Sequence, residues 1–161
     1  MSTGALFTVT FWLAAPFWAV MILLPRWSGT ARIMASPWVT VLPLAVYLAL
    51  AVPHAGEHWA AVSRPDLEVL RGYLGRDYGA ALVWAQLISF DLFLGRWMYR
   101  EAARCGIPSA LVSPLLLITV VLSPVGLSAF LAVRSARGAD RLPGRSGRDR
   151  SGAGAGSPLV R

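Results

Sequence analysis

The chain has 161 residues, of which 56% are hydrophobic and only 14% are charged. Soluble domains usually carry about a quarter charged residues, so this composition argues against a domain that is surrounded by water. The single cysteine, Cys105, excludes an internal disulfide and a cysteine-rich metal site. The net charge of +7 comes entirely from fifteen arginines, seven of them at or after Arg134. We therefore assign this charge to membrane topology or a membrane surface rather than to nucleic acid.

Four apolar stretches have the length of membrane-crossing helices, which need roughly 20 mainly apolar residues. They cover about residues 4–24, 37–53, 79–99 and 107–133. The last stretch contains Pro108, Pro114 and Pro124, which spans tolerate where neighbouring helices satisfy the freed backbone groups. These stretches predict an all-α fold, an integral membrane bundle of about four transmembrane helices within a domain of residues 1–134.

Two polar segments flank the third and fourth stretches. Residues 54–78 hold seven charged side chains and predict an interfacial loop, with a short amphipathic helix near residues 66–73. Residues 135–161 are rich in Arg, Gly, Ser and Pro and predict a disordered basic tail, because they bury too little apolar area to fold. With four spans, the arginines favour a multi-pass protein of the cell membrane with both termini in the cytoplasm.

Asp91 is the most informative residue, because it lies in the middle of the third apolar stretch. Ionisable residues at that depth are costly, face the interior of the bundle and usually serve function. A neutral carboxylic acid in a dry pocket can act as a general acid. The alternative is a structural Asp91 that is hydrogen-bonded to a neighbouring helix or paired with Arg96.

Aromatic side chains surround this acid in the sequence. We select Trp18, Trp84, Phe90, Phe93 and Trp97 as candidate pocket residues, because aromatic faces stabilise cations. For Trp97 an aromatic belt at the membrane interface is an equal alternative. Arg96 is a candidate to hold Asp91 or a polar group of the substrate.

A second cluster, His54-Ala55-Gly56-Glu57-His58, follows the second stretch. Its spacing formally matches an inverted zinc-protease pattern. Pro53 and Gly56 disfavour a regular helix, and the sequence offers no third ligand, so we expect no metal here. Glu57 remains a candidate second acid or base, against the simpler interpretation of a wetted loop face.

Three strings of residues carry a resemblance to a known family. Residues 16–27 (PFWAVMILLPRW), 90–97 (FDLFLGRW) and 124–127 (PVGL) resemble the abscisic-acid-deficient-four-like family of small four-helix membrane proteins. The chain departs from the family pattern at Gln86, where a His is common, and at Ser123, where a Gly is common. The resemblance implies a bacterial member of a family whose plant representative is linked to neoxanthin formation. It also implies a redox-neutral isomerisation or cyclisation of an isoprenoid that requires no cofactor.

These observations lead to one main hypothesis and one alternative. The main hypothesis is an isoprenoid isomerase or terpene cyclase that starts by protonation, with Asp91 as general acid, on a carotenoid-type or prenylated aromatic or indole substrate. The expected partners are the bilayer, the lipophilic substrate, a biosynthetic enzyme such as a prenyltransferase and a second copy of the chain. The alternative is a non-catalytic scaffold that presents an isoprenoid to a partner enzyme. A carrier is less favoured, because only one acid lies at the midplane.

Overall fold

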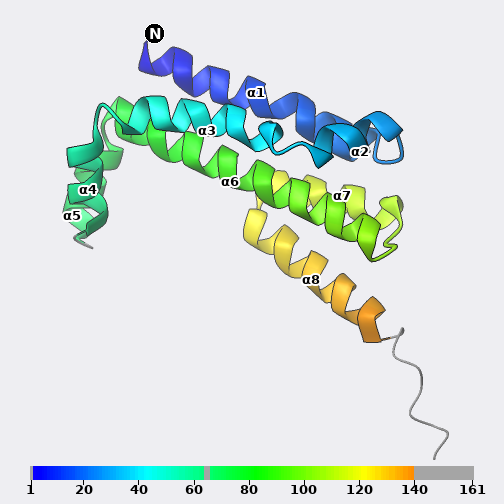
Figure 1. Cartoon of the computed structure of the whole chain (residues 1–161). Coiled ribbons are helices and arrows are strands. Elements are labelled where there is room, and N and C mark those ends of the chain that lie inside the picture. The colour runs from blue at the N-terminus through cyan, green and yellow to red at the C-terminus, as the bar shows by residue number, and fades with distance from the viewer. Residues whose placement is uncertain (1, 64–65, 140–161) are drawn as a thin grey trace, which may run out of the picture.

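The computed structural model describes residues 2–63 and 66–139, and these residues form helices without any strand. The all-helical prediction is therefore confirmed. Eight helices follow one another along the described chain (Figure 1): α1 Thr3–Leu23, α2 Ser28–Ala35, α3 Trp38–Ala51, α4 Ala55–Ser63, α5 Leu67–Leu74, α6 Asp77–Arg104, α7 Ser109–Val121 and α8 Ser123–Ala139.

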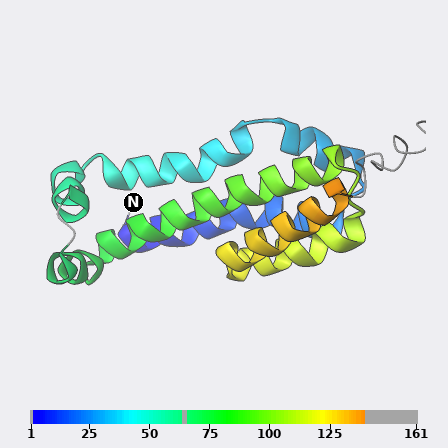
Figure 2. The same ribbon diagram turned by 90° about the horizontal axis from the view of Figure 1, so that it is seen from below.

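The long helices α1, α3 and α6 lie side by side and form the body of the molecule (Figures 1 and 2). The short helices α4 and α5 lie across one end of this bundle, the end at which α1 and α6 begin. The opposite end holds α2 and the turn between α6 and α7. This turn uses Gly106, whose positive φ of 63° favours glycine, while Ile107 N–H closes the end of α6 on Ala102 O at 2.9 Å.

Two of the four predicted spans are single helices that are long and apolar enough to cross a membrane, α1 and α6. The second predicted span corresponds to α2 and α3, which pass the same test together and are bent by 49° at the break between them. Pro37 stands at this break, where the residue before a proline disfavours helix. The described residues thus contain two or three candidate crossings, which supports a membrane protein but does not confirm four spans.

The fourth predicted span is not a continuous helix. It consists of α7 and α8, which are separated by the non-helical residue Leu122 (φ −137°, ψ 70°). Pro124 follows at the second position of α8, where its missing N–H and fixed φ suit a new helix start. The chain turns sharply here, and α8 lies beside α7 (Figure 2).

Gly126 permits the close approach of α8 to α7. A Cβ built on Gly126 would come within 2.7 Å of both the backbone N and the Cα of Thr119. The hydroxyl of Thr119 is satisfied on its own helix, because it donates to Leu115 O at 2.8 Å. We call this pair of helices with its turn the α7–α8 hairpin.

Three contacts give the direction of α8 along α6. Asp91 meets Ser123, Trp97 meets Phe130 and Glu101 meets Arg134. The residue numbers rise together on both helices, so α8 runs parallel to α6.

Two clusters of buried side chains divide the core. The larger one fills the half of the bundle that the α7–α8 hairpin covers and includes Trp18, Leu92, Leu116 and Phe130. The smaller one joins α1, α3 and α6 in the other half. The hairpin therefore covers α1 and α6 over only part of their length.

The segments outside the apolar stretches show one confirmation and two corrections. Residues 55–63 form the regular helix α4, where the sequence predicted an interfacial loop and Gly56 was expected to disfavour a helix. The predicted amphipathic helix is α5, and Asp66 caps it by accepting from the N–H groups of Glu68 and Val69 at 2.8 and 3.2 Å. The predicted disordered tail begins too early, because residues 135–139 continue α8. The rest of that tail, 140–161, lies outside the described residues. Figure 1 places the start of α1 and the described end of α8 at opposite ends of the bundle.

Candidate functional site

Asp91 lies at the middle of α6, 14 residues after Asp77 and 13 before Arg104. The hydroxyl of Ser123 donates to Asp91 Oδ1 at 2.5 Å, from the first residue of α8. Ser123 reaches this depth because the α7–α8 hairpin turns there instead of continuing across. The other carboxyl oxygen, Oδ2, has no hydrogen-bond partner in the part of the chain that the structure describes, so it can face a bound molecule.

Two of the predicted tryptophans lie between α1 and α6 on the helix face that carries Asp91. Trp18 is buried, and its ring fills the space beside Gly95, one turn after Asp91. Trp84 lies two turns before Asp91 and stacks on Phe7 with ring centroids 5.1 Å apart. The indole Nε1 of Trp84 is buried and has no hydrogen-bond partner among the described residues. The α1–α6 contact thus supplies an aromatic ring on each side of the acid.

Phe90 and Phe93 do not join this group. Phe93 is two residues from Asp91, which turns it by about 200° around the helix. Both rings are more than half exposed and line a shallow apolar groove of about 230 Å³ with Thr40 and Leu44 of α3.

Arg96 binds α2 rather than Asp91. Its Nε donates to Met34 O at 2.8 Å and its Nη2 donates to Ala35 O at 3.1 Å. These carbonyls are at the C-terminal end of α2, where cationic side chains are stabilised by unpaired carbonyls and the helix dipole. Arg96 therefore holds α2 against α6.

Trp97 packs on α8. Its ring meets Phe130 edge to face, with centroids 5.7 Å apart, and Phe130 is fully buried. This contact places the partly buried Trp97 against the α7–α8 hairpin. It fixes the position of α8 rather than lining the Asp91 site.

Glu57 lies on α4 at the far end of the bundle. It accepts hydrogen bonds from the guanidinium of Arg76 and the hydroxyl of Tyr78. Tyr78 is 13 residues before Asp91 on α6, which corresponds to about 20 Å along the helix. The structure therefore does not bring Glu57 and Asp91 into one site, because α4, which carries Glu57, lies across the end of the bundle.

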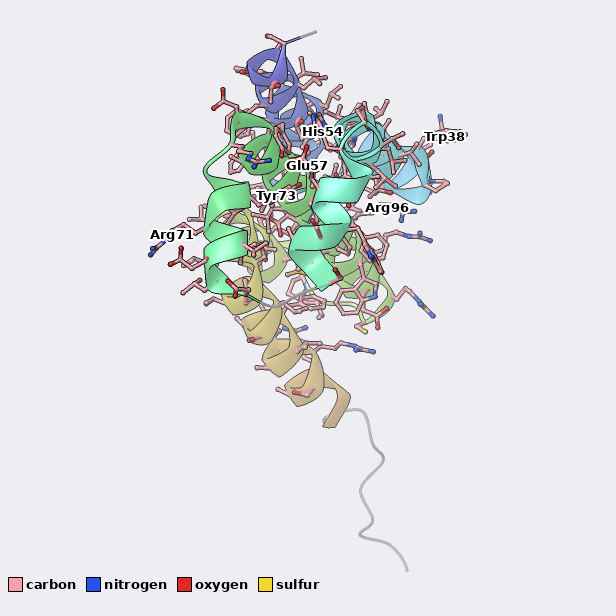
Figure 3. The ribbon with its side chains drawn as sticks, turned by 90° about the vertical axis from the view of Figure 1, so that its left-hand side faces the viewer. Trp38, His54, Glu57, Arg71, Tyr73 and Arg96 are labelled. Atoms are coloured by element: carbon pink, nitrogen blue, oxygen red, sulfur yellow. The ribbon has the colours of Figure 1, made fainter. Side chains whose placement is uncertain are left out.

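Glu57 belongs instead to a polar cluster between α3, α4, α5 and α6 (Figure 3). Figure 3 shows His54, Glu57 and Tyr73 gathered at this end, whereas Arg71 points away. Beside the cluster is an open cavity of about 330 Å³, lined by Glu57, Glu68, Tyr73 and Arg76 among others.

His58 forms the centre of this cluster. Its Nδ1 is 3.1 Å from the hydroxyl of Tyr73, and its Nε2 is 3.5 Å from the hydroxyl of Tyr47. Burial raises the pKa of Tyr73, and the neighbouring Tyr78, Tyr47 and Glu57 raise it further. The sequence pattern identified the two histidines and Glu57 but not the tyrosines, which come from three different helices.

His54 lies at the edge of the same cluster. Its Nδ1 is 3.1 Å from Leu50 O, and its ring stacks on Tyr78 with centroids 4.2 Å apart. No group of three or more metal-ligating side chains occurs within the residues that the structure describes.

Sequence reasoning did not select Ser123 as a site residue. One feature of the sequence could have drawn attention to Ser123: a serine stands here where a glycine is common in the resembled family. Its partner could not be identified from the sequence, because a continuous span over 107–133 would place residue 123 nearer the far end of its helix.

Comparison with known proteins identifies the family of the chain. The family model described as ABA DEFICIENT 4-like matches residues 5–130, which run from α1 into α8 and include Asp91 and Ser123. No curated protein and no solved structure matches the chain. Since the match covers most of the sequence, the chain belongs to the ABA DEFICIENT 4-like family, which is linked to neoxanthin and carotenoid-related function.

Proposed function

We propose that this protein is a membrane-embedded isoprenoid isomerase or terpene cyclase in which Asp91 is the catalytic acid. The observation that carries the proposal is the Asp91–Ser123 pair, a carboxyl group placed halfway along a candidate membrane-crossing helix. Ser123 binds one of its oxygens, and the other has no hydrogen-bond partner among the described residues. Intramembrane acids are costly and are retained mainly where they function. The family link to carotenoid-related function agrees with a lipophilic substrate.

The reaction needs only proton transfer. Asp91 Oδ2 gives its proton to a substrate alkene carbon or epoxide oxygen, so that an O–H bond breaks and a new C–H or O–H bond forms. The π electrons of the alkene form the new C–H bond, or one C–O bond of the protonated epoxide breaks and leaves a hydroxyl group. In both cases positive charge develops on carbon, where a rearrangement or ring closure takes place. The Asp91 carboxylate then removes a proton from a neighbouring carbon, and this step forms the new double bond and restores the acid. Substrate and product are isomers, and no cofactor is consumed.

The surroundings of Asp91 support each step. The rings of Trp18 and Trp84 lie on the same face of α6, and aromatic faces stabilise developing cations. The hydroxyl of Ser123 fixes the carboxyl group through Oδ1. The α7–α8 hairpin leaves part of α1 and α6 uncovered, which gives a lipophilic substrate access from the bilayer.

A second candidate function rests on the same hydrogen bond. Asp91 and Ser123 join α6 to α8, and an interhelical hydrogen bond in a membrane is also a structural contact. In that case the protein is a scaffold that binds an isoprenoid for a partner enzyme such as a prenyltransferase, alone or as a homodimer.

Asp91→Asn separates the two functions, because asparagine has the same shape and still accepts from Ser123. The matched control is Asp77→Asn, the same replacement at the exposed start of α6. Membranes that contain each protein would be given carotenoid epoxides and prenylated aromatic or indole compounds, and products would be separated by chromatography and mass spectrometry. A catalyst should make a product of unchanged mass and new retention time.

General acid–base catalysis contributes about 10²–10⁴-fold, so Asp91→Asn should lower the rate by at least about 100-fold. Asp77→Asn should retain the rate of the original chain. No isomer from any substrate, with the original chain folded and abundant, would favour the scaffold. An active Asp91→Asn variant would remove Asp91 from the catalytic role.

A further inference from the structure

We infer that the α7–α8 hairpin is re-entrant, so that the chain crosses the membrane three times and its arginine-rich end faces the cytoplasm. The three crossings are α1, the bent α2–α3 pair and α6. This inference does not depend on the proposed function. It replaces the sequence prediction of four spans with both termini in the cytoplasm.

The length of α7 is the first argument. Its 13 residues extend about 20 Å, whereas the hydrocarbon core of a bilayer is about 30 Å thick. The turn after α7 reaches Asp91, at the middle of α6. A helix that starts beside the end of α6 and stops beside its middle has entered the membrane without crossing it.

The path of α8 is the second argument. From Ser123 it proceeds parallel to α6 past Phe130, and Arg134 Nη2 then meets Glu101 Oε1 at 2.8 Å, three residues before the end of α6. From Asp91 to Glu101 α6 rises about 15 Å, and from Ser123 to Arg134 α8 rises about 17 Å. The hairpin thus leaves the membrane at the end where it entered.

Three N–H groups at the turn are satisfied inside the protein, which is what broken helices at membrane depth require of their backbone. The N–H of Leu122 donates to Ile118 O at 2.7 Å. The N–H groups of Val125 and Gly126 both donate to Leu122 O, at 3.0 and 2.9 Å. Pro124 has no N–H to satisfy.

The charge distribution gives the orientation. One end of the bundle contains α2, the α6–α7 turn and the C-terminal ends of α1 and α8. We call it the arginine-rich end. Two contacts tie it together, Arg26 Nε to Ser109 Oγ at 3.0 Å and Tyr99 hydroxyl to Pro25 O at 2.8 Å. Within the described residues, this end has one acidic side chain, Glu101, and seven arginines: Arg26, Arg32, Arg96, Arg100, Arg104, Arg134 and Arg137.

The opposite end has the reverse balance. Its described charged residues are Glu57, Asp66, Glu68 and Asp77 against Arg71 and Arg76. Arginine and lysine near the spans set orientation, and they favour the cytoplasmic side with its anionic lipid headgroups. The arginine-rich end therefore faces the cytoplasm and the start of α1 faces the other side.

Cysteine accessibility tests the topology in the full-length chain. The native Cys105 reports on the arginine-rich end, and a Cys105→Ser background can carry a single cysteine at Ser2 or at Ser135, both of which are exposed. The proteins are labelled with a membrane-impermeant maleimide in right-side-out and inverted vesicles. Labelling after detergent solubilisation shows that each thiol is reactive.

Cys105 and S135C should react only in inverted vesicles, and S2C only in right-side-out vesicles. If S2C and S135C react from the same side, the hairpin crosses the membrane and the inference is wrong. If S2C is opposite to the other two but faces the cytoplasm, the assigned orientation is wrong. Replacing Arg26, Arg32, Arg100 and Arg104 by glutamine should give a mixed orientation, and an unchanged pattern would contradict orientation by these arginines.

Discussion

Replacing Gly126 by alanine tests the packing of the α7–α8 hairpin. The new Cβ would come within 2.7 Å of the backbone N and Cα of Thr119, whereas carbon atoms pack best at about 3.5–4.0 Å. Because these are backbone atoms, no side-chain rotation relieves the contact, and α7 and α8 must separate by about 1 Å. Overpacking of this kind costs typically about 1–3 kcal/mol.

Gly72→Ala is the matched control, since Gly72 lies in the exposed helix α5 and a Cβ there meets nothing within 4 Å. Alanine is favoured over glycine in a helix by up to about 1 kcal/mol, so this variant should be as stable as the original chain or more stable. The assay is the fraction of folded, monodisperse protein after heating in detergent. Gly126→Ala should lose its folded fraction at a lower temperature. A Gly126→Ala protein as stable as Gly72→Ala would refute the close approach of α7 and α8.

Three further predictions concern other contacts. Gly95→Ala should destabilise the folded state by about 1–3 kcal/mol and so lower the melting temperature, because the new Cβ would overlap the buried ring of Trp18. Ser123→Ala should lower the rate of isomer formation while substrate binding is retained, because the Asp91 carboxyl group loses the donor that orients it; an unchanged rate would contradict this role. Burial raises the pKa of Tyr73 above its unfolded value, so the folded state keeps this proton longer and stability should fall as the pH rises above about 10. The melting temperature of Tyr73→Phe, measured from pH 8 to 11.5, should fall less steeply than that of the original chain.

Much of the fold could be predicted from the sequence, because apolar length is a strong signal in a membrane. The uninterrupted stretches of residues 4–24 and 79–99 correspond to α1 and α6. The short amphipathic helix near residues 66–73 could also be predicted, and it corresponds to α5, whose first N–H groups are capped by Asp66. The described ends of α1 and α6 differ from the predicted ones by one to five residues.

The α7–α8 hairpin could not be predicted in this way. Residues 107–133 have the length and composition of one span, and prolines within spans are tolerated often enough that Pro124 did not identify a reversal. What decides the reversal is packing between residues distant in the sequence, such as Gly126 on Thr119 and Phe130 on Trp97. The predicted roles of Arg96 and Glu57 beside Asp91 were wrong for the same reason, because the partners of both side chains belong to other helices.

The hairpin also explains why a small protein can hold an acid at the middle of the membrane. A continuous fourth helix would present only the side chains along its face to Asp91. A turn at this depth instead brings the first residue of a new helix, Ser123, and its hydroxyl to the carboxyl group. The same turn ends the cover of the hairpin over α1 and α6 (Figure 2). In the proposed function, one structural feature thus fixes the carboxyl group and leaves a path for a lipid-soluble substrate. A mutation that weakens the packing of the hairpin, such as Gly126→Ala, is therefore expected to lower activity as well as stability.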